Sequence, residues 1–292
     1  MAAAVPFHPD ADLKACDEVD LYYGFGKPPD YAGAMKCGIY QRAHPDPTRG
    51  DPFAGPGILS MIYANGKTGI RDYDPALKFI CENTWAGDVE KEARLEHIEQ
   101  MRAGKMRGDF DLCDDATSGL MQGACEGIRQ GFADAQRDRE TSHFEQQLSE
   151  AARRDFAALR QSSEEFIAAR IRNEVDLSGT RRGAFELTER GILRDQFLIN
   201  LRRFSTGDVP RTSPREAQDI DQRLNDAYAR ALAKPAAGTV NAGGIQNTES
   251  AWVALRKQWI SFARVAWPTL PEIDVGAQIT RLRAHQLESL AK

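Results

Sequence analysis

The sequence predicts an all-α protein in which a short helical-repeat scaffold is followed by antiparallel helical bundles. Two observations lead to this prediction. Apolar residues recur at three- and four-residue steps through most of the chain, and a pattern of helix, glycine turn and helix occurs twice near its start. We expect three domains: a repeat region over residues 1–108, one helical domain over 109–205 and a second over 206–292.

The repeat consists of two stretches about forty residues apart. The stretch "DLYYGFGKPPDYAGAMKC" returns as "SMIYANGKTGIRDYDPALKFIC". We expect first helices over 12–23 and 57–64, each ended by glycines that adopt a positive φ without strain. An Asp then caps the next helix, namely Asp30 in the first copy and either Asp72 or Asp74 in the second.

This pattern resembles the Sel-type subfamily of tetratricopeptide-like repeats, for which "YANG-x-G…D…A" is typical. The resemblance covers roughly residues 12–102 and is closest in "IYANGKTGIRDYDPALKF". It implies paired helices that build a concave protein-binding surface, which secreted cysteine-rich members staple with disulfides. One more amphipathic helix is expected from about 88 to 103.

The remaining residues predict longer helices. Periodic apolar residues indicate one or two helices between about 132 and 174, and another that ends near Phe204 after a break at Gly179. The linker "STGDVPRTSP" then leads into "IDQRLNDAYARAL", a polar loop over 234–248, a Trp-rich helix and a final helix, "AQITRLRAHQLESL".

Three tryptophans share one face of the Trp-rich helix, because they lie seven and eight residues apart. The face could be an exposed aromatic patch, but we expect it to belong to the core. The arginines near it are then expected to serve as packing stems and rim charges. The residues concerned are Trp252, Trp259, Trp267, Arg256, Arg264 and Arg283.

The order of motifs after the linker resembles the lysozyme-inhibitor LprI-like domain, and residues 110–204 look like a degenerate first copy of it. The resemblance implies a periplasmic protein that binds and inhibits a lysozyme-type enzyme. Its three elements are carried by Leu224, Asn225, Tyr228 and Leu232, by Trp259, Ile260 and Arg264, and by Thr280, Arg283 and Leu287.

All five cysteines lie in the first 125 residues, which favours disulfides and an oxidising compartment. Of the fifteen ways to form two pairs, we favour Cys16 with Cys37 and Cys113 with Cys125. We expect a periplasmic or secreted protein whose signal peptide has been removed, since "MAAAVPFHPDAD" contains none. The alternative is a cytosolic protein with reduced, buried cysteines.

Composition and motifs exclude several functions. No apolar run approaches the roughly 20 residues of a transmembrane helix. No basic patch with interleaved aromatic residues indicates a nucleic-acid partner. The histidines are scattered, and no nucleophile elbow, phosphate loop, dinucleotide fingerprint or zinc spacing is present. We therefore expect no enzyme, no cofactor and no metal, and we expect Cys81 to be disulfide-bonded or buried.

The stretch "CDDATSGLMQGAC" supports two interpretations. Asp114 and Asp115 could form a pair of carboxylates for acid and base catalysis or a calcium site. Alternatively, an acidic residue caps the helix that follows, with Thr117 and Ser118 satisfying its first amides. We favour the cap.

These observations predict a protein that binds another protein, such as a hydrolase or an effector toxin. The first hypothesis is a periplasmic inhibitor, or an immunity protein, against a cell-wall-degrading or other envelope-targeting enzyme. The second is an envelope adaptor that does not inhibit, and the third is a hydrolase that uses Asp114 and Asp115. The candidate binding residues are Asp109, Asp111, Asp114 and Asp115 on an acidic face, and Asn241 and Gln246 in the polar loop.

Overall fold

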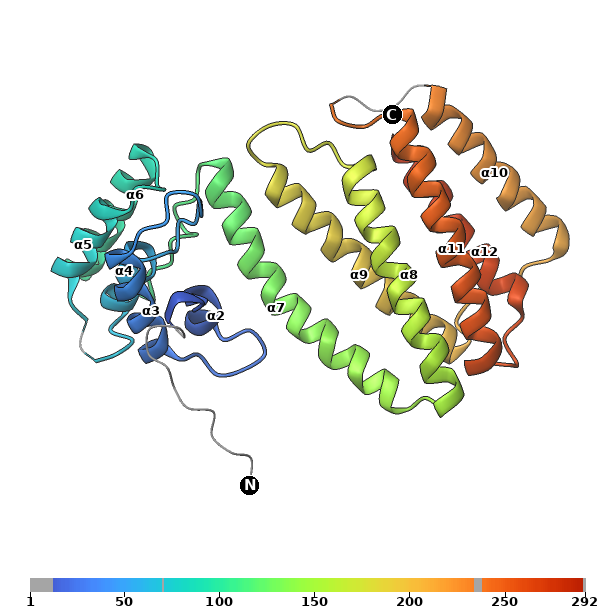
Figure 1. Cartoon of the computed structure of the whole chain (residues 1–292), viewed down its shortest axis with the longest axis horizontal. Helices are drawn as coiled ribbons and strands as arrows, with labels where there is room; N and C mark the ends of the chain where they lie inside the picture. The colour runs from blue at the N-terminus through green and yellow to red at the C-terminus, as the bar shows by residue number, and fades with distance from the viewer. Residues whose placement is uncertain (1–12, 70, 234–237, 291–292) are drawn as a thin grey trace. The chain divides into compact units, whose positions relative to one another are not determined.

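The computed structural model describes residues 13–69, 71–233 and 238–290. In these ranges it contains eleven α-helices and no strand, which confirms the all-α prediction (Figure 1). The chain divides into two compact units, residues 1–132 and 133–292. This division differs from the three domains expected from the sequence. No helix in the described ranges combines the length and the apolar content needed to cross a membrane.

Unit 1 is a series of short helices in which each helix packs on the next one along the chain. This sequential packing is the pattern expected of a helical repeat. Its helices are α2 (Glu18–Tyr23), α3 (Tyr31–Ala43), α4 (Pro56–Asn65), α5 (Tyr73–Glu82) and α6 (Asp88–Arg102), followed by the first part of α7 (Gly119–Gln146).

The turns of unit 1 follow the local sequence signals. Gly24 and Gly66 end α2 and α4 with φ of 66° and 63°. A side chain at Gly24 would bring its Cβ within 2.4 Å of the Lys27 carbonyl oxygen, so the turn requires glycine. The Asp30 carboxylate accepts from the Gly33 amide at 2.8 Å to cap α3, and Asp72, rather than Asp74, caps α5.

The first repeat helix is interrupted, although one continuous helix was expected over 12–23. Residue 12 lies outside the described residues, residues 13–14 are helical, residues 15–17 are not, and α2 begins at Glu18. The Asp17 carboxylate accepts from the Asp20 amide at 2.8 Å and fixes the start of the helix there.

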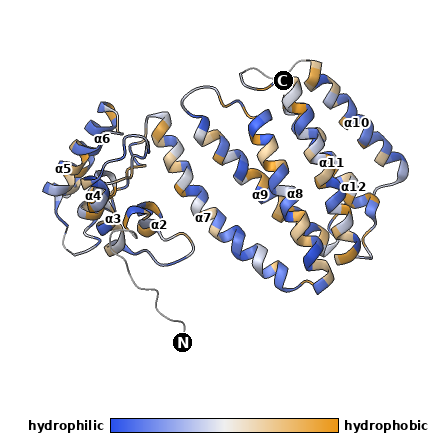
Figure 2. Cartoon of the chain, in the orientation of Figure 1, coloured by the Kyte–Doolittle hydropathy of each residue, from blue (hydrophilic) through white to orange (hydrophobic). Residues whose placement is uncertain are grey.

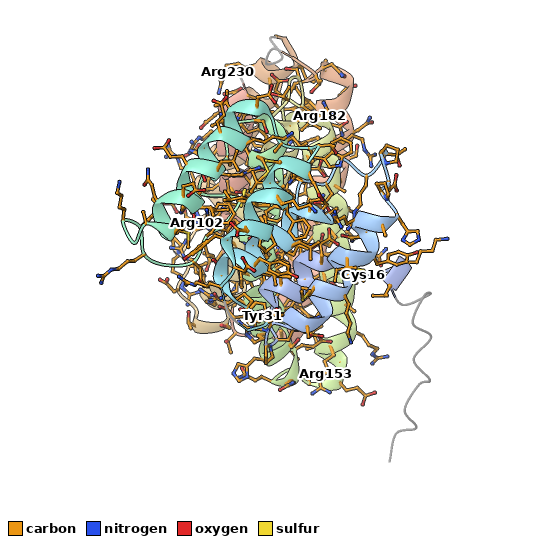
Figure 3. All side chains as sticks on the ribbon, turned by 90° about the vertical axis from the view of Figure 1, so that its left-hand side faces the viewer. Cys16, Tyr31, Arg102, Arg153, Arg182 and Arg230 are labelled. Carbon is orange, nitrogen blue, oxygen red and sulfur yellow. A yellow bond between two sulfur atoms is a disulfide. The ribbon has the colours of Figure 1, made fainter. Side chains whose placement is uncertain are left out.

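Two disulfides hold unit 1, and they join the pairs favoured by the sequence analysis. Cys16 is bonded to Cys37 of α3, and Cys113 is bonded to Cys125 of α7. By the chain-entropy argument, loops of this length each contribute on the order of 3 kcal/mol. Cys81 is unpaired and exposed, so the expectation that it is bonded or buried is wrong. Figure 3 shows Cys16 among the unit 1 side chains.

The core of unit 1 explains why the unit does not end at residue 108. Phe110, Leu112 and Met121 are completely buried in the same apolar cluster as Phe53 and Ile98. Residues beyond the expected boundary thus complete the core of unit 1.

Unit 2 contains the second part of α7 and five further helices. In Figure 2 hydrophilic and hydrophobic residues alternate along these helices, as expected of amphipathic helices. Exposed arginines such as Arg153, Arg182 and Arg230 are labelled in Figure 3. The five helices are α8 (Glu150–Glu174), α9 (Arg182–Thr206), α10 (Pro214–Ala233), α11 (Ala242–Ala266) and α12 (Glu272–Leu290).

The helices expected to form two separate domains share one core in unit 2. Helix α8 packs along α11, and α10 packs along α12. Phe156 of α8 lies 5.4 Å from Phe262 of α11, and Phe204 of α9 lies 5.3 Å from Trp259, measured between ring centroids. The boundary expected at 205 therefore falls inside a common core.

The tryptophan face belongs to this core, as predicted. Trp252 and Trp259 are buried, and half-buried Trp267 packs against Phe262. The prediction for Arg283 is wrong, because its side chain is completely buried in an ion-pair cluster. Arg264 is an exposed rim charge as expected, paired with Glu272 at 2.6 Å.

The polar loop expected over 234–248 is wrong in its second half. Residues 234–237 lie outside the described residues, but α11 begins at Ala242 and continues through two glycines. A Cβ at Gly244 would lie 3.0 Å from the Cβ of Asn173 in α8, so the glycine lets the two helices approach closely. The hydroxyl of Thr248 donates to the Ala169 carbonyl at 3.3 Å in the same contact.

Candidate functional site

The four acidic residues predicted to bind a partner lie in and around the turn that precedes α7. Asp109 accepts from Lys67 Nζ at 2.7 Å and lies 3.3 Å from Arg71 Nη2. Its side chain is 52% exposed, so this ion pair is formed at the surface. The basic residues come from the turn between α4 and α5, and they neutralise the Asp109 carboxylate.

Asp111 and Asp114 organise the backbone of the turn. Asp111 Oδ2 accepts from the Tyr23 hydroxyl at 2.7 Å, and Asp111 Oδ1 accepts from the Cys113 amide at 2.9 Å. Asp114 Oδ2 accepts from the Asp111 amide at 3.3 Å. Burial raises the pKa of Asp114, and the neighbouring carboxylates of Asp111 and Asp115 add to the shift.

Asp115 lies 3.1 Å from His97 Nδ1 of α6, with both side chains mostly buried. This contact holds the turn against α6. The carboxylates of Asp114 and Asp115 are thus both engaged in holding the turn, and neither lines any of the three hollows described below. Within the described ranges, no group of three or more His, Cys, Asp or Glu side chains is arranged to hold a metal ion.

The Ser118 hydroxyl accepts from the Met121 amide at 3.2 Å and caps α7 as expected, while a residue that the sequence analysis missed holds the backbone just before the helix. Glu90 of α6 accepts from the Thr117 amide at 2.9 Å and the Ser118 amide at 2.6 Å. Burial acts to raise the pKa of Glu90, but these amide donors outweigh it and the pKa is lowered. The acidic part of the expectation is therefore wrong, since the carboxylate that accepts amides here is that of Glu90 rather than of Asp114 or Asp115. Nothing in the local sequence indicates Glu90, because the contact depends on how α6 packs.

Asn241 and Gln246, the other predicted binding residues, belong to α11 rather than to a loop. Asn241 is the N-cap residue, and its Oδ1 accepts from the Gly244 amide at 2.9 Å. Gln246 is exposed on the first turns of the helix. These two residues lie in unit 2 and the four acidic residues lie in unit 1, so the described structure does not join them into one site.

A large hollow lies on unit 1, and we call it the unit 1 hollow. The sequence analysis did not predict which residues line it. Its volume is about 1120 Å³. Three segments build it: the end of α3, the Pro-rich loop that leads to the start of α4, and the residues that follow α5. Its wall includes Tyr40, Arg42, His44, Pro45, Pro47, Arg49, Glu82 and Trp85.

Ion pairs and ring contacts order the walls of the unit 1 hollow. Arg42 donates to both carboxylate oxygens of Glu82 at 2.5 and 2.9 Å and lies over the Phe79 ring. The Tyr40 ring stacks on His44 with 4.4 Å between the ring centroids. These contacts fix long side chains that would otherwise lose rotamer entropy when a partner binds.

A buried carboxylate contacts two residues that line the hollow, Gln41 and Arg49. Glu18 of α2 is fully buried and accepts from Gln41 Nε2 at 2.5 Å and from Arg49 Nη2 at 3.1 Å. Gln41 Oε1 in turn accepts from the Gly55 amide at 2.8 Å. Burial raises the pKa of Glu18 to about 7, and Asp51 adds to the shift although Gln41 opposes it.

Comparison with known proteins adds no family to this description. No family model matches the chain, and neither a curated protein nor a solved structure matches it significantly. The resemblances to the Sel-type repeat and to the LprI-like domain therefore stay predictions.

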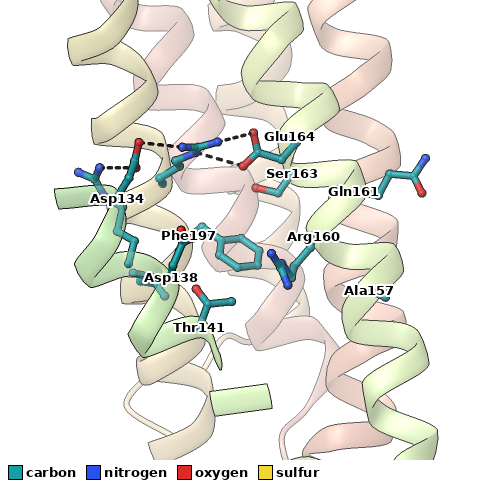
Figure 4. A pocket seen from close by; sticks show the side chains of 12 residues that line it. Asp134, Asp138, Thr141, Ala157, Arg160, Gln161, Ser163, Glu164 and Phe197 are labelled. Atoms are coloured by element: carbon teal, nitrogen blue, oxygen red, sulfur yellow. Dashed lines mark hydrogen bonds and ion pairs between the residues drawn. The ribbon is translucent and has the colours of Figure 1, made fainter. Parts of the chain in front are cut away.

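A second hollow, the unit 2 groove, lies between α7, α8 and α9 and has a volume of about 480 Å³ (Figure 4). Arg194 of α9 bridges Asp134 of α7 at 3.1 Å and Glu164 of α8 at 3.1 Å. Arg137 of α7 pairs with Asp195 of α9 at 2.7 Å. These pairs neutralise one another across the groove, so no single charge sign dominates it.

Proposed function

We propose that the protein binds and inhibits an enzyme that acts on the bacterial cell envelope. The target is a lysozyme-like cell-wall hydrolase or another toxic enzyme against which the protein confers immunity. The observation that carries this proposal is the unit 1 hollow, because its wall combines a tryptophan, a tyrosine and two arginines. These are the residue types that most often dominate the binding energy of protein interfaces.

The side chains in the wall of the hollow are held in fixed positions, which favours an inhibitor over an adaptor that does not inhibit. An inhibitor has to present a rigid surface, since a surface that is already ordered loses less entropy on binding. The Cys16–Cys37 disulfide, the Arg42–Glu82 pair and the contacts of Glu18 with Gln41 and Arg49 supply such rigidity in this part of unit 1.

An extracytoplasmic location agrees with this function. Both disulfides lie in unit 1, and disulfides persist in oxidising compartments such as the bacterial periplasm. We therefore place the proposed inhibitor in the periplasm or outside the cell, where it would meet envelope-targeting enzymes.

The test is inhibition of peptidoglycan hydrolysis by the purified, oxidised chain. A lysozyme and a set of envelope hydrolases are each assayed with increasing amounts of the protein, and the chain is also assayed alone. Trp85→Ala and Tyr40→Ala are expected to weaken inhibition at least tenfold, whereas Arg230→Ala in unit 2 is the matched control. If no envelope hydrolase is inhibited, the proposal fails.

The alternative is an envelope adaptor that binds without inhibiting. The unit 2 groove favours it, since a second hollow offers a second place for a partner. Binding of an envelope protein with full retention of that protein's activity would select the adaptor. Hydrolysis by the chain alone that disappears in Asp114→Asn would instead select the hydrolase hypothesis.

A further inference from the structure

A small cavity inside unit 2 carries an inference that is independent of the proposed function. Four helices, α8, α9, α11 and α12, line this cavity, which has a volume of about 50 Å³ and opens to the surface. At roughly 10–15 Å³ for each water-sized group, the cavity has room for about three to five such groups. Most of its lining is apolar or aromatic and includes Phe166, Leu193, Leu255, Trp259 and Ile279.

Two polar atoms of the lining have no hydrogen-bond partner in the part of the chain that the structure describes. One is the indole Nε1 of Trp252, and the other is the side-chain Oε1 of Gln286. Trp252 is only 6% exposed, and both atoms are shielded from solvent. A buried donor and a buried acceptor are each unfavourable when they are left unpaired, so both favour a ligand that pairs with them.

Two further polar residues of the lining, Arg283 and Gln196, are already paired. Arg283 donates to Glu174 and Glu249, so its charge is balanced within the protein. Gln196 Nε2 donates to Asn200 Oδ1 at 3.2 Å. The cavity therefore offers no free positive charge to a carboxylate ligand, and the unpaired Gln286 oxygen would repel one.

We propose that this cavity binds a small neutral primary carboxamide. The carbonyl oxygen of the amide accepts from Trp252 Nε1, and the amide NH₂ group donates to Gln286 Oε1. A short alkyl group fills the apolar part of the cavity. A hydroxyl group would have to accept from Trp252 and donate to Gln286 through a single oxygen atom. A carboxamide makes the two hydrogen bonds through two different atoms. Half-exposed Gln196, Leu282 and Gln286 mark where the cavity reaches the surface.

The test uses the full chain labelled with ¹⁵N at its tryptophan indoles and titrated with propionamide, propionate or 1-propanol. Trp252→Phe assigns the Trp252 resonance. We expect a saturable shift of this resonance with propionamide, no shift with propionate, and at least tenfold weaker binding of 1-propanol. Gln286→Met should weaken propionamide binding at least tenfold, while Gln246→Met, on the exposed surface of α11, should leave it unchanged.

The comparison of the three compounds on the unaltered chain needs no variant to fold. If propionamide causes no saturable shift, the proposal is overturned. Equal binding of propionate, or tighter binding of 1-propanol, also overturns it. None of these outcomes bears on enzyme inhibition, so the proposed function stands or fails separately.

Discussion

Arg283 and Glu174 form a bidentate ion pair in the interior of unit 2. Guanidinium Nη2 and Nη1 donate to the two carboxylate oxygens at 2.6 and 2.8 Å, and neither side chain is exposed to solvent. Glu249 accepts from Arg283 Nε at 2.9 Å, and Arg170 donates to Glu174 at 2.7 Å. The cluster connects α8, α11 and α12 and balances its buried charges almost entirely within the protein.

Removing one member of this cluster should destabilise unit 2 strongly. Arg283→Met leaves Glu174 and Glu249 with less positive charge nearby in a poorly solvated interior, and we expect a loss of about 3–5 kcal/mol in the free energy of unfolding. Chemical denaturation followed by circular dichroism measures this loss. The control is Arg264→Met, which removes an exposed ion pair and should have a much smaller effect.

A double variant separates the contribution of the ion pair to stability from the cost of burying each charge alone. Arg283→Met combined with Glu174→Leu removes opposite charges together, so it should be less destabilising than the sum of the two single changes. Additive losses would show that the two residues do not depend on each other, contrary to the geometry.

The buried Glu18 should make the stability of unit 1 depend on pH. Its pKa rises from 4.5 in the unfolded chain to about 7 in the folded chain. The folded state therefore binds the proton more tightly, and the resulting stability is complete below about pH 4.5 and is lost as the pH rises through about 7. Thermal unfolding of the protein and of Glu18→Gln between pH 4.5 and 8 measures this contribution.

The Glu18→Gln variant cannot ionise at this position, so the difference in stability between the variant and the unaltered chain should change across that window. We expect the variant to gain stability relative to the unaltered protein as the pH rises from 4.5 to 8. A difference that stays constant over the window would mean that Glu18 keeps an ordinary pKa.

The Glu90 contact predicts an effect at the start of α7. Glu90→Ala removes the acceptor for the Thr117 and Ser118 amides, and we expect it to cost about 1–3 kcal/mol because these donors lose their partner. Amide hydrogen exchange should quicken at Thr117 and Ser118. Glu92→Ala, an exposed neighbour on the same helix, is the control.

The pKa of Glu90 is lowered in the folded state, so the sign of its pH dependence is opposite to that of Glu18. Its contribution is present at neutral pH and is lost as the pH falls through the folded pKa. Equal exchange rates in Glu90→Ala and the unaltered chain would contradict the role of Glu90 in holding these amides.

The features that the sequence predicted well are local ones. Gly24, Gly66 and Asp30 act within a few residues of their own position, so a short stretch carries enough information to place the turns and the cap. The spacing of Trp252 and Trp259 likewise places both on one face of a helix, whatever that face contacts.

The features that were missed depend on which helices meet. Arg283 and Arg264 look alike in the sequence, yet one is buried against Glu174 from α8 and the other is exposed. The glycines at 243 and 244 suggested a loop, because their role becomes clear only when α8 is placed beside α11. Three separate segments form the unit 1 hollow, and no single sequence motif predicts it.

The cysteine arrangement gives a prediction that also tests the proposed compartment. Two disulfides leave Cys81 as the one unpaired cysteine, and its side chain is exposed. Protein prepared without reductant should therefore take up one maleimide per chain, both folded and in denaturant, and five after reduction. Mass spectrometry of the labelled protein counts the adducts, and Cys81→Ser, which should take up none without reductant, is the matched control. Uptake of five labels in denaturant without any reductant would indicate reduced cysteines and favour the cytosolic alternative, since disulfides are rarely maintained in that compartment.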